Sequence, residues 1–529
     1  MALNVLASAR IVATYSVFNH TYDEPAHVAC GMEWLDRGVY RWEPQHPPLA
    51  RVAAALPLYL AGMRSRNTQR DLPFAMWQEG AAILYSGDRY ERNLALTRLG
   101  ILPFFWLAAA VVYAWGARYF RPAVAVAAVF LFSMLPPVLA HAGLATTDMA
   151  LTATMALAFF AGIIWLEQPS LSRAMWFGAA TGVMTLSKFS ALVFFPASVA
   201  LALFWCLSTE WQGWARLAGA LRARALSFAL AILTGALVIW AGYRFSFGDA
   251  GFLHLRLPAP ELYAGIRQVI EHNALGQDSY LLGSYNRAGF WLFFPVALAV
   301  KTPLGILILA AVALILGLRT RSSNRNLRVL VAYAAGILFV AVFSRIDIGI
   351  RHVLPMYVGL SLSGAVALVR LLEWSNTRRW LQAALTVLVL WVAGSSLLSH
   401  PDYLAYFNEL AGSQPEKILV DSDLDWGQDL KRLAARLREV GATDVTFDPY
   451  MPGDVEKELG FPRIHRMNPD APSPGWNAIG AMLWKEAGLI HWPDRIPPQE
   501  RVGKSIFLWY FAPAPASTGT VAPGNRGTE

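Results

Sequence analysis

Apolar runs separated by short polar segments recur along the chain as far as residue 398. Runs of this length and composition are typical of helices that cross a bilayer. The pattern predicts eleven such helices, several of them shorter than the usual ~20 residues. They cover residues 3–18, 94–115, 123–140, 149–166, 174–187, 189–207, 226–245, 291–318, 329–343, 353–370 and 380–398. We therefore expect an all-α polytopic membrane module over 1–398.

The pattern changes after residue 398. Segments 417–423 and 444–450 are predicted as strands, and 429–440 as an amphipathic helix. The apolar face of this helix carries Leu430, Leu433, Leu437 and Val440. These elements predict a small α/β domain over 399–511, followed by a disordered tail over 512–529.

Arginines gather in every second connecting loop. These loops are 116–122, 167–173, 208–225, 319–328 and 371–379. Positively charged loops stay in the cytoplasm, so the N-terminus is expected inside and the C-terminal domain outside. The long loops 19–93 and 246–290 then face out, and 74–86 in the first is predicted as an interfacial helix.

The composition agrees with a membrane protein. Hydrophobic residues make up 56% of the 529 residues and charged residues only 15%, against about 25% in soluble domains. The net charge of +8 is explained by the cytoplasmic loops and requires no nucleic acid. The two cysteines, Cys30 and Cys206, are expected on opposite sides of the membrane, so no disulfide is predicted. We interpret 3–18 as a retained span rather than a cleaved signal.

Charged and histidine residues that membrane anchoring does not require fall near the predicted outer face. They are Asp23, Glu24, His46, Arg98, Asp148, Lys188, Arg351 and His352. Lys301 lies either inside the span 291–318 or at the outer boundary of an interfacial helix over 289–300. A charge at mid-depth costs at least ~2.5 kcal/mol, so Lys301 needs an anionic partner in either case.

Each of these residues also has a structural explanation. Asp23, Glu24 and Asp148 are suited to capping helix N-termini. The basic residues Arg98, Lys188 and Arg351 are suited to reaching lipid head groups. His46, which precedes two prolines, is suited to holding a turn. The occurrence of the whole set at one face is harder to explain in this way.

Acids and bases together at one membrane face fit the transfer of a group from a lipid phosphate. Arginine and lysine stabilise the departing phosphate, and a carboxylate deprotonates the acceptor hydroxyl or binds a divalent cation. We assign the phosphate to Arg98, Lys188, Lys301, Arg351 and His352, and substrate contact to His46. Asp23 and Asp148 are the candidate metal ligands. Neighbouring residues point about 100° apart on a helix, so Asp23 is the expected base and Glu24 an orienting or structural partner.

Several segments, in this order, resemble membrane glycosyltransferases of the GT-C fold. They are YDEPAH (22–27), HPPLA (46–50), TRLG (97–100), LATTDMAL (144–151), TLSKFSALVFFP (185–196), KTPLG (301–305) and RHVLPMY (351–357). The chain is similar in particular to bacterial family 39 relatives of the protein O-mannosyltransferases and of the lipid A aminoarabinose transferase.

The resemblance implies an inverting enzyme with a polyprenyl-phosphate monosaccharide donor at the periplasmic face of a bacterial inner membrane. It implies that Asp23 is the base, that Arg98 and Lys188 hold the donor phosphate, and that Asp148 lies near the donor or a metal. The acceptor is a glycan, a lipid or a protein. Protein O-mannosyltransferases carry additional lumenal sugar-binding domains that this sequence does not match, which argues against a protein acceptor.

Other interpretations stay open. The acidic residues Asp421, Asp423, Asp425 and Asp429 either bind a cation or cap a solvated helix, which we favour. A transporter or flippase for a lipid-linked anion is the main alternative function, but it needs charges along a path through the bilayer. A lipid-linked glycan ligase or polymerase of another fold need not have the early Asp-Glu pair.

Overall fold

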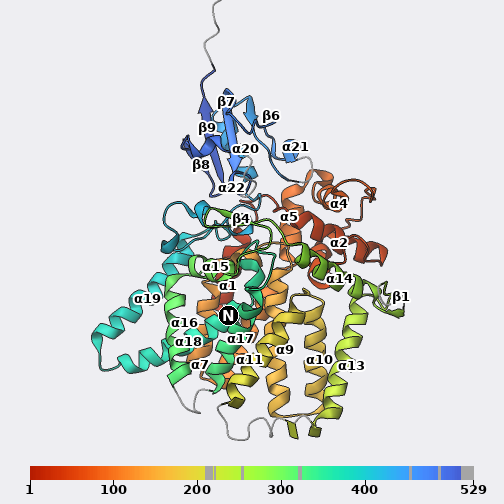
Figure 1. Cartoon of the computed structure of the whole chain (residues 1–529), viewed down its shortest axis with the longest axis vertical. Helices are drawn as coiled ribbons and strands as arrows, with labels where there is room; N and C mark the ends of the chain where they lie inside the picture. The colour runs from red at the N-terminus through yellow and green to blue at the C-terminus, as the bar shows by residue number, and fades with distance from the viewer. Residues whose placement is uncertain are drawn as a thin grey trace, which may run out of the picture.

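The computed structural model describes residues 1–208, 218–219, 222–251, 255–319, 325–451, 455–485 and 490–513. A bundle of helices forms one end of the molecule and a small sheet domain the other (Figure 1). Most of the predicted tail 512–529, and parts of the loops 208–225 and 319–328, lie outside the described residues.

The described residues include six helices that are long and apolar enough to cross a membrane, or eight spans if two bent pairs are counted. The six are α5–α6 (Tyr90–Leu99 and Leu102–Tyr119), α9 (Asp148–Glu167), α11 (Ala191–Ser208), α13 (Ala225–Gly242), α18 (Met356–Ser375) and α19 (Arg379–Leu398). One bent pair is α7 (Pro122–Ser133) with α8 (Pro136–Ala142), at 69°. The other is α15 (Phe293–Lys301) with α16 (Leu304–Arg319), at 118°. The chain is a multi-pass membrane protein.

The expected number of eleven spans is higher than helix length supports. The predicted spans 3–18, 174–187 and 329–343 form the short helices α1 (Ala2–Ala13), α10 (Leu171–Thr185) and α17 (Arg325–Ala341). Each of these helices still exposes large apolar side chains, such as Val5, Trp176 and Phe339. A Cβ on Gly178 of α10 would overlap the main chain of Ala231 on α13, so the missing side chain permits the close approach.

The predicted outer loops form helices and hairpins on the side of the sheet domain. The helices are α2 (Glu24–Arg37), α3 (Pro48–Leu60), α4 (Ala75–Leu84) and α14 (Pro260–Leu275). Two hairpins that the sequence analysis did not predict are β1–β2 (Phe247–Asp249, Arg256–Pro258) and β3–β4 (Ser279–Leu281, Ser284–Asn286). Helix α4 agrees with the helix predicted over 74–86.

The C-terminal domain is a mixed five-stranded sheet of order β6-β5-β7-β9-β8. Its strands are β5 (Asp444–Thr446), β6 (Arg463–His465), β7 (Gly475–Gly480), β8 (Glu500–Val502) and β9 (Ile506–Phe511). Helix α20 (Leu430–Glu439) buries Leu430, Leu433 and Leu437 against it, as the amphipathic pattern predicted. The short helices α21 (Val455–Leu459) and α22 (Ala481–Lys485) complete the domain. The expected mixed α/β character of this region is confirmed.

The strand predicted over 417–423 is wrong. This segment forms two single 3-10 turns, η5 (Pro415–Lys417) and η6 (Asp421–Asp423), because Asp421 has a left-handed backbone with φ of 50°. Turn η6 pairs with η3 (Ile350–Val353) instead of with a strand, since the Asp423 carboxylate accepts a hydrogen bond from the N–H of Ile350 at 3.0 Å. Turn η6 therefore connects the outer domain to the membrane helices through its contact with η3.

Candidate active site

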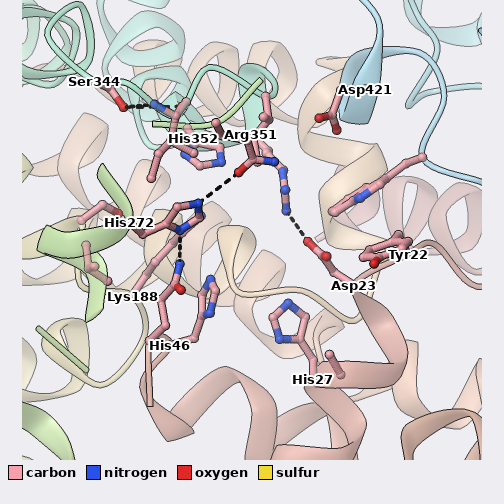
Figure 2. A pocket seen from close by; sticks show the side chains of 18 of the residues that line it. Tyr22, Asp23, His27, His46, Lys188, His272, Ser344, Arg351, His352 and Asp421 are labelled. Carbon is pink, nitrogen blue, oxygen red and sulfur yellow. Dashed lines mark hydrogen bonds and ion pairs between the residues drawn. The ribbon is translucent and has the colours of Figure 1, made fainter. Parts of the chain in front are cut away.

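A cavity of about 850 Å³ lies where the outer helices, the membrane helices and the C-terminal domain meet. One part of its wall is apolar and comes from α11, α14 and α17. It includes Leu192, Val193, Phe194, Ile266, Ile270 and Val340. The other part is polar, and its side chains point toward one another in Figure 2. The cavity thus has one apolar wall and one charged wall.

Arg351 of η3 stands at the centre of the charged wall. Its Nη1 lies 3.0 Å from Oδ2 of Asp23 and 4.0 Å from Oδ2 of Asp148 (Figure 2 shows the bond to Asp23). The Nζ of Lys188 lies 2.6 Å from Oδ1 of Asp148. The Arg351 guanidinium also lies over the ring of Trp426, 4.1 Å from its centroid. Two cations and two carboxylates therefore alternate in the order Lys188, Asp148, Arg351, Asp23.

Neither Asp23 nor Asp148 acts as a helix cap. Asp23 occupies the residue before α2, but its side chain makes no bond to the helix N–H groups and lines the cavity. Asp148 is the first residue of α9, and its carboxylate accepts from the Thr146 hydroxyl and from Lys188. The capping explanation for these two residues is therefore not what the structure shows.

Glu24 turns away from the cavity and binds Arg98. The Nε and Nη2 of Arg98 each lie 2.9 Å from one of its carboxylate oxygens, and both side chains are at most 1% exposed. Glu24 also accepts hydrogen bonds from the N–H groups of Thr21 and Ala145. As the helix geometry predicted, Asp23 and Glu24 face different partners. Arg98 does not line the cavity, so its predicted contact with the donor phosphate lacks geometric support.

Replacement of Arg98 by methionine is expected to destabilise the fold, because it leaves the Glu24 carboxylate buried without its cation. Breaking a buried ion pair in this way costs about 3–5 kcal/mol. Thermal unfolding of the detergent-solubilised variant measures the effect. The control is Lys431→Met, which breaks the more exposed pair with Glu91 and should cost at most about 1 kcal/mol. An Arg98 variant that melts normally but no longer binds undecaprenyl phosphate would restore the phosphate role.

Lys301 also lies outside the cavity lining, at the sharp bend between α15 and α16. Its Nζ donates to the carbonyl oxygens of Leu404 at 2.7 Å and Asp423 at 2.5 Å, and it lies over the ring of Phe407. The structure agrees with the alternative in which the straight span 291–318 is broken near this residue. Among the described residues its ammonium group is therefore bound by main-chain carbonyl oxygens, and no ion pair with a carboxylate forms.

His46 and His352 both line the cavity. His46 lies beside Glu43 and Arg51, and Arg51 in turn donates from Nε to Nδ1 of His27 at 3.0 Å. Burial is the main reason that the pKa of His46 is lowered, which favours a neutral imidazole at neutral pH. Sequence reasoning missed the Glu43–Arg51 pair, although Arg51 directly follows the HPPLA segment.

The acidic residues of the C-terminal domain are buried, so the interpretation as a solvated helix cap is wrong. Asp423 and Asp429 are fully covered, and the side chain of Asp429 makes no cap bond to α20. Asp429 accepts from the Ser505 hydroxyl at 2.9 Å, whereas Asp425 accepts from the N–H of Met482 at 3.0 Å. Because the carboxylates turn to separate partners, they do not converge. The described part of the chain has no group of three or more His, Cys, Asp or Glu residues placed to hold a metal ion.

Asp421 is different, because it lines the cavity near Asp23 and Arg351. Burial raises its pKa from 3.8 to about 7, although Arg351 acts in the opposite direction. The folded chain therefore holds this proton more tightly than the unfolded chain does. The resulting stabilisation is full below pH 4 and is lost as the pH rises through about 7.

Asp421→Asn should remove this part of the pH dependence. Between pH 5 and pH 8 the melting temperature of the wild type is expected to fall further than that of the variant. Differential scanning fluorimetry across this range tests the expectation, with Asp470→Asn as the control for an exposed carboxylate of the same domain. Parallel curves for wild type and Asp421→Asn would contradict it.

Several buried polar atoms of cavity-lining residues lack hydrogen-bond partners among the described residues. They are Arg351 Nε, Ser190 Oγ, Glu43 Oε1 and Trp77 Nε1. A buried polar group without a partner costs about 1–3 kcal/mol, and such groups are rare in native proteins. Their gathering around one cavity supports its choice as the candidate site.

Comparison with known proteins finds one family match, over part of the chain. The profile of the dolichyl-phosphate-mannose-protein mannosyltransferase family matches residues 97–240. This match confirms the resemblance to this glycosyltransferase family and the expected enzyme class, a membrane glycosyltransferase. A search of curated proteins finds no match.

The fold is that of ArnT from Cupriavidus metallidurans bound to undecaprenyl phosphate, at a TM-score of 0.52 and 13% identity. The match covers 96% of this chain and 97% of that one. The apo state of the same protein matches at a TM-score of 0.49 and 16% identity, over 79% of this chain and 66% of that one. The Archaeoglobus fulgidus oligosaccharyltransferase tethered with an acceptor peptide matches at 0.41 and 14%, over 75% of this chain and 53% of that one.

Proposed function

We propose that the protein transfers a monosaccharide from a polyprenyl phosphate to an acceptor hydroxyl, with inversion, at the extracytoplasmic face of the membrane. The observation that carries the proposal is the alternating row of Lys188, Asp148, Arg351 and Asp23 beside an apolar wall. A lipid phosphate needs both environments at once, because its head group is anionic and its chain is apolar. The undecaprenyl phosphate bound to ArnT is such a lipid.

The donor phosphate is bound by Lys188 and Arg351. Charge-assisted hydrogen bonds from lysine and arginine are strong, and they strengthen as negative charge develops on the leaving phosphate. Asp148 lies between the two cations and fixes their separation. Leu192, Phe194 and their neighbours on α14 and α17 hold the first part of the polyprenyl chain.

Asp23 is the general base. It removes the proton of the acceptor hydroxyl, whose oxygen forms a bond to the anomeric carbon. The bond from that carbon to the phosphate oxygen breaks, and its electron pair leaves with the phosphate. Attack from the side opposite to the phosphate inverts the anomeric centre. No step of this sequence uses Arg98 or Lys301, because both are committed to buried partners.

The proposed location is the periplasmic side of a bacterial inner membrane. Residues of the sheet domain, among them Tyr450 and Ile506, line part of the cavity. This domain lies at one end of the molecule (Figure 1), and the arginine-rich loops predict that this end faces away from the cytoplasm. We propose that 1–398 is the transferase module and that 399–511 is an outer domain. A flippase is less well supported, since the charged residues of the cavity gather at this end rather than along a transmembrane path.

The test is transfer by the purified protein in lipid nanodiscs. A panel of radiolabelled undecaprenyl-phosphate monosaccharides is supplied with a mixture of acceptors, with and without a metal chelator. We expect release of undecaprenyl phosphate and a labelled product from at least one donor. Movement of intact lipid-linked sugar across acceptor-free liposomes, without any cleavage of the donor, would instead favour a flippase.

A further inference from the structure

Three aromatic side chains form a wall of the cavity next to Asp23. They are Tyr22, Trp77 and Tyr450, and we call them the aromatic wall. The rings of Tyr22 and Tyr450 are stacked, with centroids 5.6 Å apart and planes at 19°. The ring of Trp77 lies 5.7 Å from that of Tyr22. The wall therefore joins the segment before α2, the helix α4 and the loop after β5.

The wall is held in place by the main chain. The N–H of Tyr22 donates to the carbonyl oxygen of Trp426 at 3.1 Å. Tyr450 has a left-handed backbone, with φ of 43°, and its N–H donates to the Asp448 carboxylate. Left-handed non-glycine residues are uncommon and concentrate at functional sites. The Tyr450 side chain is nevertheless 55% exposed. The left-handed backbone therefore places its ring where a ligand can reach it, and not in a hydrophobic core.

Polar groups surround the aromatic wall. Asp448 is exposed at the cavity, and Asp23 directly follows Tyr22. The exposed ring of Tyr450, with carboxylates beside the aromatic wall, matches a pyranose, which has an apolar C–H face and a rim of hydroxyls. A lipid chain requires a continuous apolar wall, and an extended peptide is usually bound by an open strand edge.

We propose that the aromatic wall is the acceptor subsite and binds a saccharide, so that the acceptor is a sugar hydroxyl. This inference rests on the proposed function, in which Asp23 is the base. A pyranose that packs on the exposed ring of Tyr450 lies in the cavity that Asp23 also lines, and it presents its hydroxyls to this carboxylate. Lys188 and Tyr22 lie on opposite sides of the Asp23–Arg351 pair (Figure 2), so donor phosphate and acceptor sugar occupy separate parts of the cavity.

The test measures binding without chemistry. The full chain in nanodiscs that contain undecaprenyl phosphate is mixed with the methyl pyranosides of glucose, galactose, mannose and N-acetylglucosamine. Saturation-transfer NMR is expected to detect at least one of them. Tyr450→Ala and Trp77→Ala should each lower the apparent affinity about fivefold, whereas Tyr450→Phe should retain it because stacking depends on the ring. The control is Tyr510→Ala, another exposed tyrosine of the domain that packs on Trp476 away from the cavity.

The proposal is overturned if no pyranoside binds, or if Tyr510→Ala has the same effect as Tyr450→Ala. It is also overturned if a serine-containing peptide or a diacylglycerol binds in a Tyr450-dependent manner and the pyranosides do not. Binding of undecaprenyl phosphate is followed in the same samples. If this lipid binds while the sugars do not, the acceptor subsite is wrong and the proposed donor site stands.

Discussion

Asp23→Asn is expected to abolish transfer while strengthening the binding of undecaprenyl phosphate. Loss of a general base lowers turnover by about 10²–10⁴-fold. However, the Asp23 carboxylate forms an ion pair with Nη1 of Arg351. It therefore competes with the lipid phosphate for this guanidinium group. Asparagine removes this negative charge, so the affinity for undecaprenyl phosphate should rise roughly tenfold, equivalent to about 1.4 kcal/mol.

Two measurements on the same preparation check this expectation. Turnover is followed with the active donor, and the affinity for undecaprenyl phosphate by its protection against thermal unfolding. The control is Asp36→Asn, which removes a carboxylate of α2, the helix that follows Asp23; this carboxylate pairs with Arg64 outside the cavity. Retained turnover would exclude Asp23 as the base. Weaker lipid binding would exclude competition for Arg351.

Lys188→Met is expected to weaken the binding of undecaprenyl phosphate by about 10–100-fold, because one charge-assisted hydrogen bond contributes about 1.5–3 kcal/mol. The single variant also leaves Asp148 buried beside Arg351 alone, which lowers stability. The double variant Lys188→Met/Asp148→Asn separates the two effects.

In the double variant the melting temperature should recover and the lipid affinity should not. Titration of undecaprenyl phosphate into both variants in nanodiscs measures the affinity. If the double variant regains lipid binding together with stability, Lys188 acts only as the partner of Asp148. In that case Arg351 alone would hold the phosphate.

The sequence predicted part of the site because helix ends at one membrane face are brought together by the bundle. Asp148 and Lys188 stand at such ends, and the structure pairs them at 2.6 Å. Arg98 satisfies the same criterion, yet it is buried against Glu24. No local pattern separates these two outcomes, since both depend on which neighbours the tertiary fold supplies.

Contacts between distant segments were beyond prediction from one sequence. Asp421 and Trp426 approach Arg351 only because the outer domain folds back onto η3. The apolar run Ile418–Val420 indicated a strand, whereas Asp421 has a left-handed backbone that no local pattern predicts. The number of eleven spans stays a prediction, because α10 and α17 have 15 and 17 residues and length alone does not decide whether a helix crosses the membrane.

The anchorage of Lys301 bears on how this protein can be engineered. Its ammonium group, at the bend of α15 and α16, binds main-chain oxygens of the outer region at Leu404 and Asp423. A domain grafted from a relative keeps these two hydrogen bonds only if its main chain passes Lys301 along the same path as Leu404 and Asp423 do here. Grafting the sheet domain of a relative onto these helices should therefore fail unless residues 400–430 are transplanted with it. Residues 400–430, which connect the helices to the sheet domain, must therefore be exchanged together with that domain.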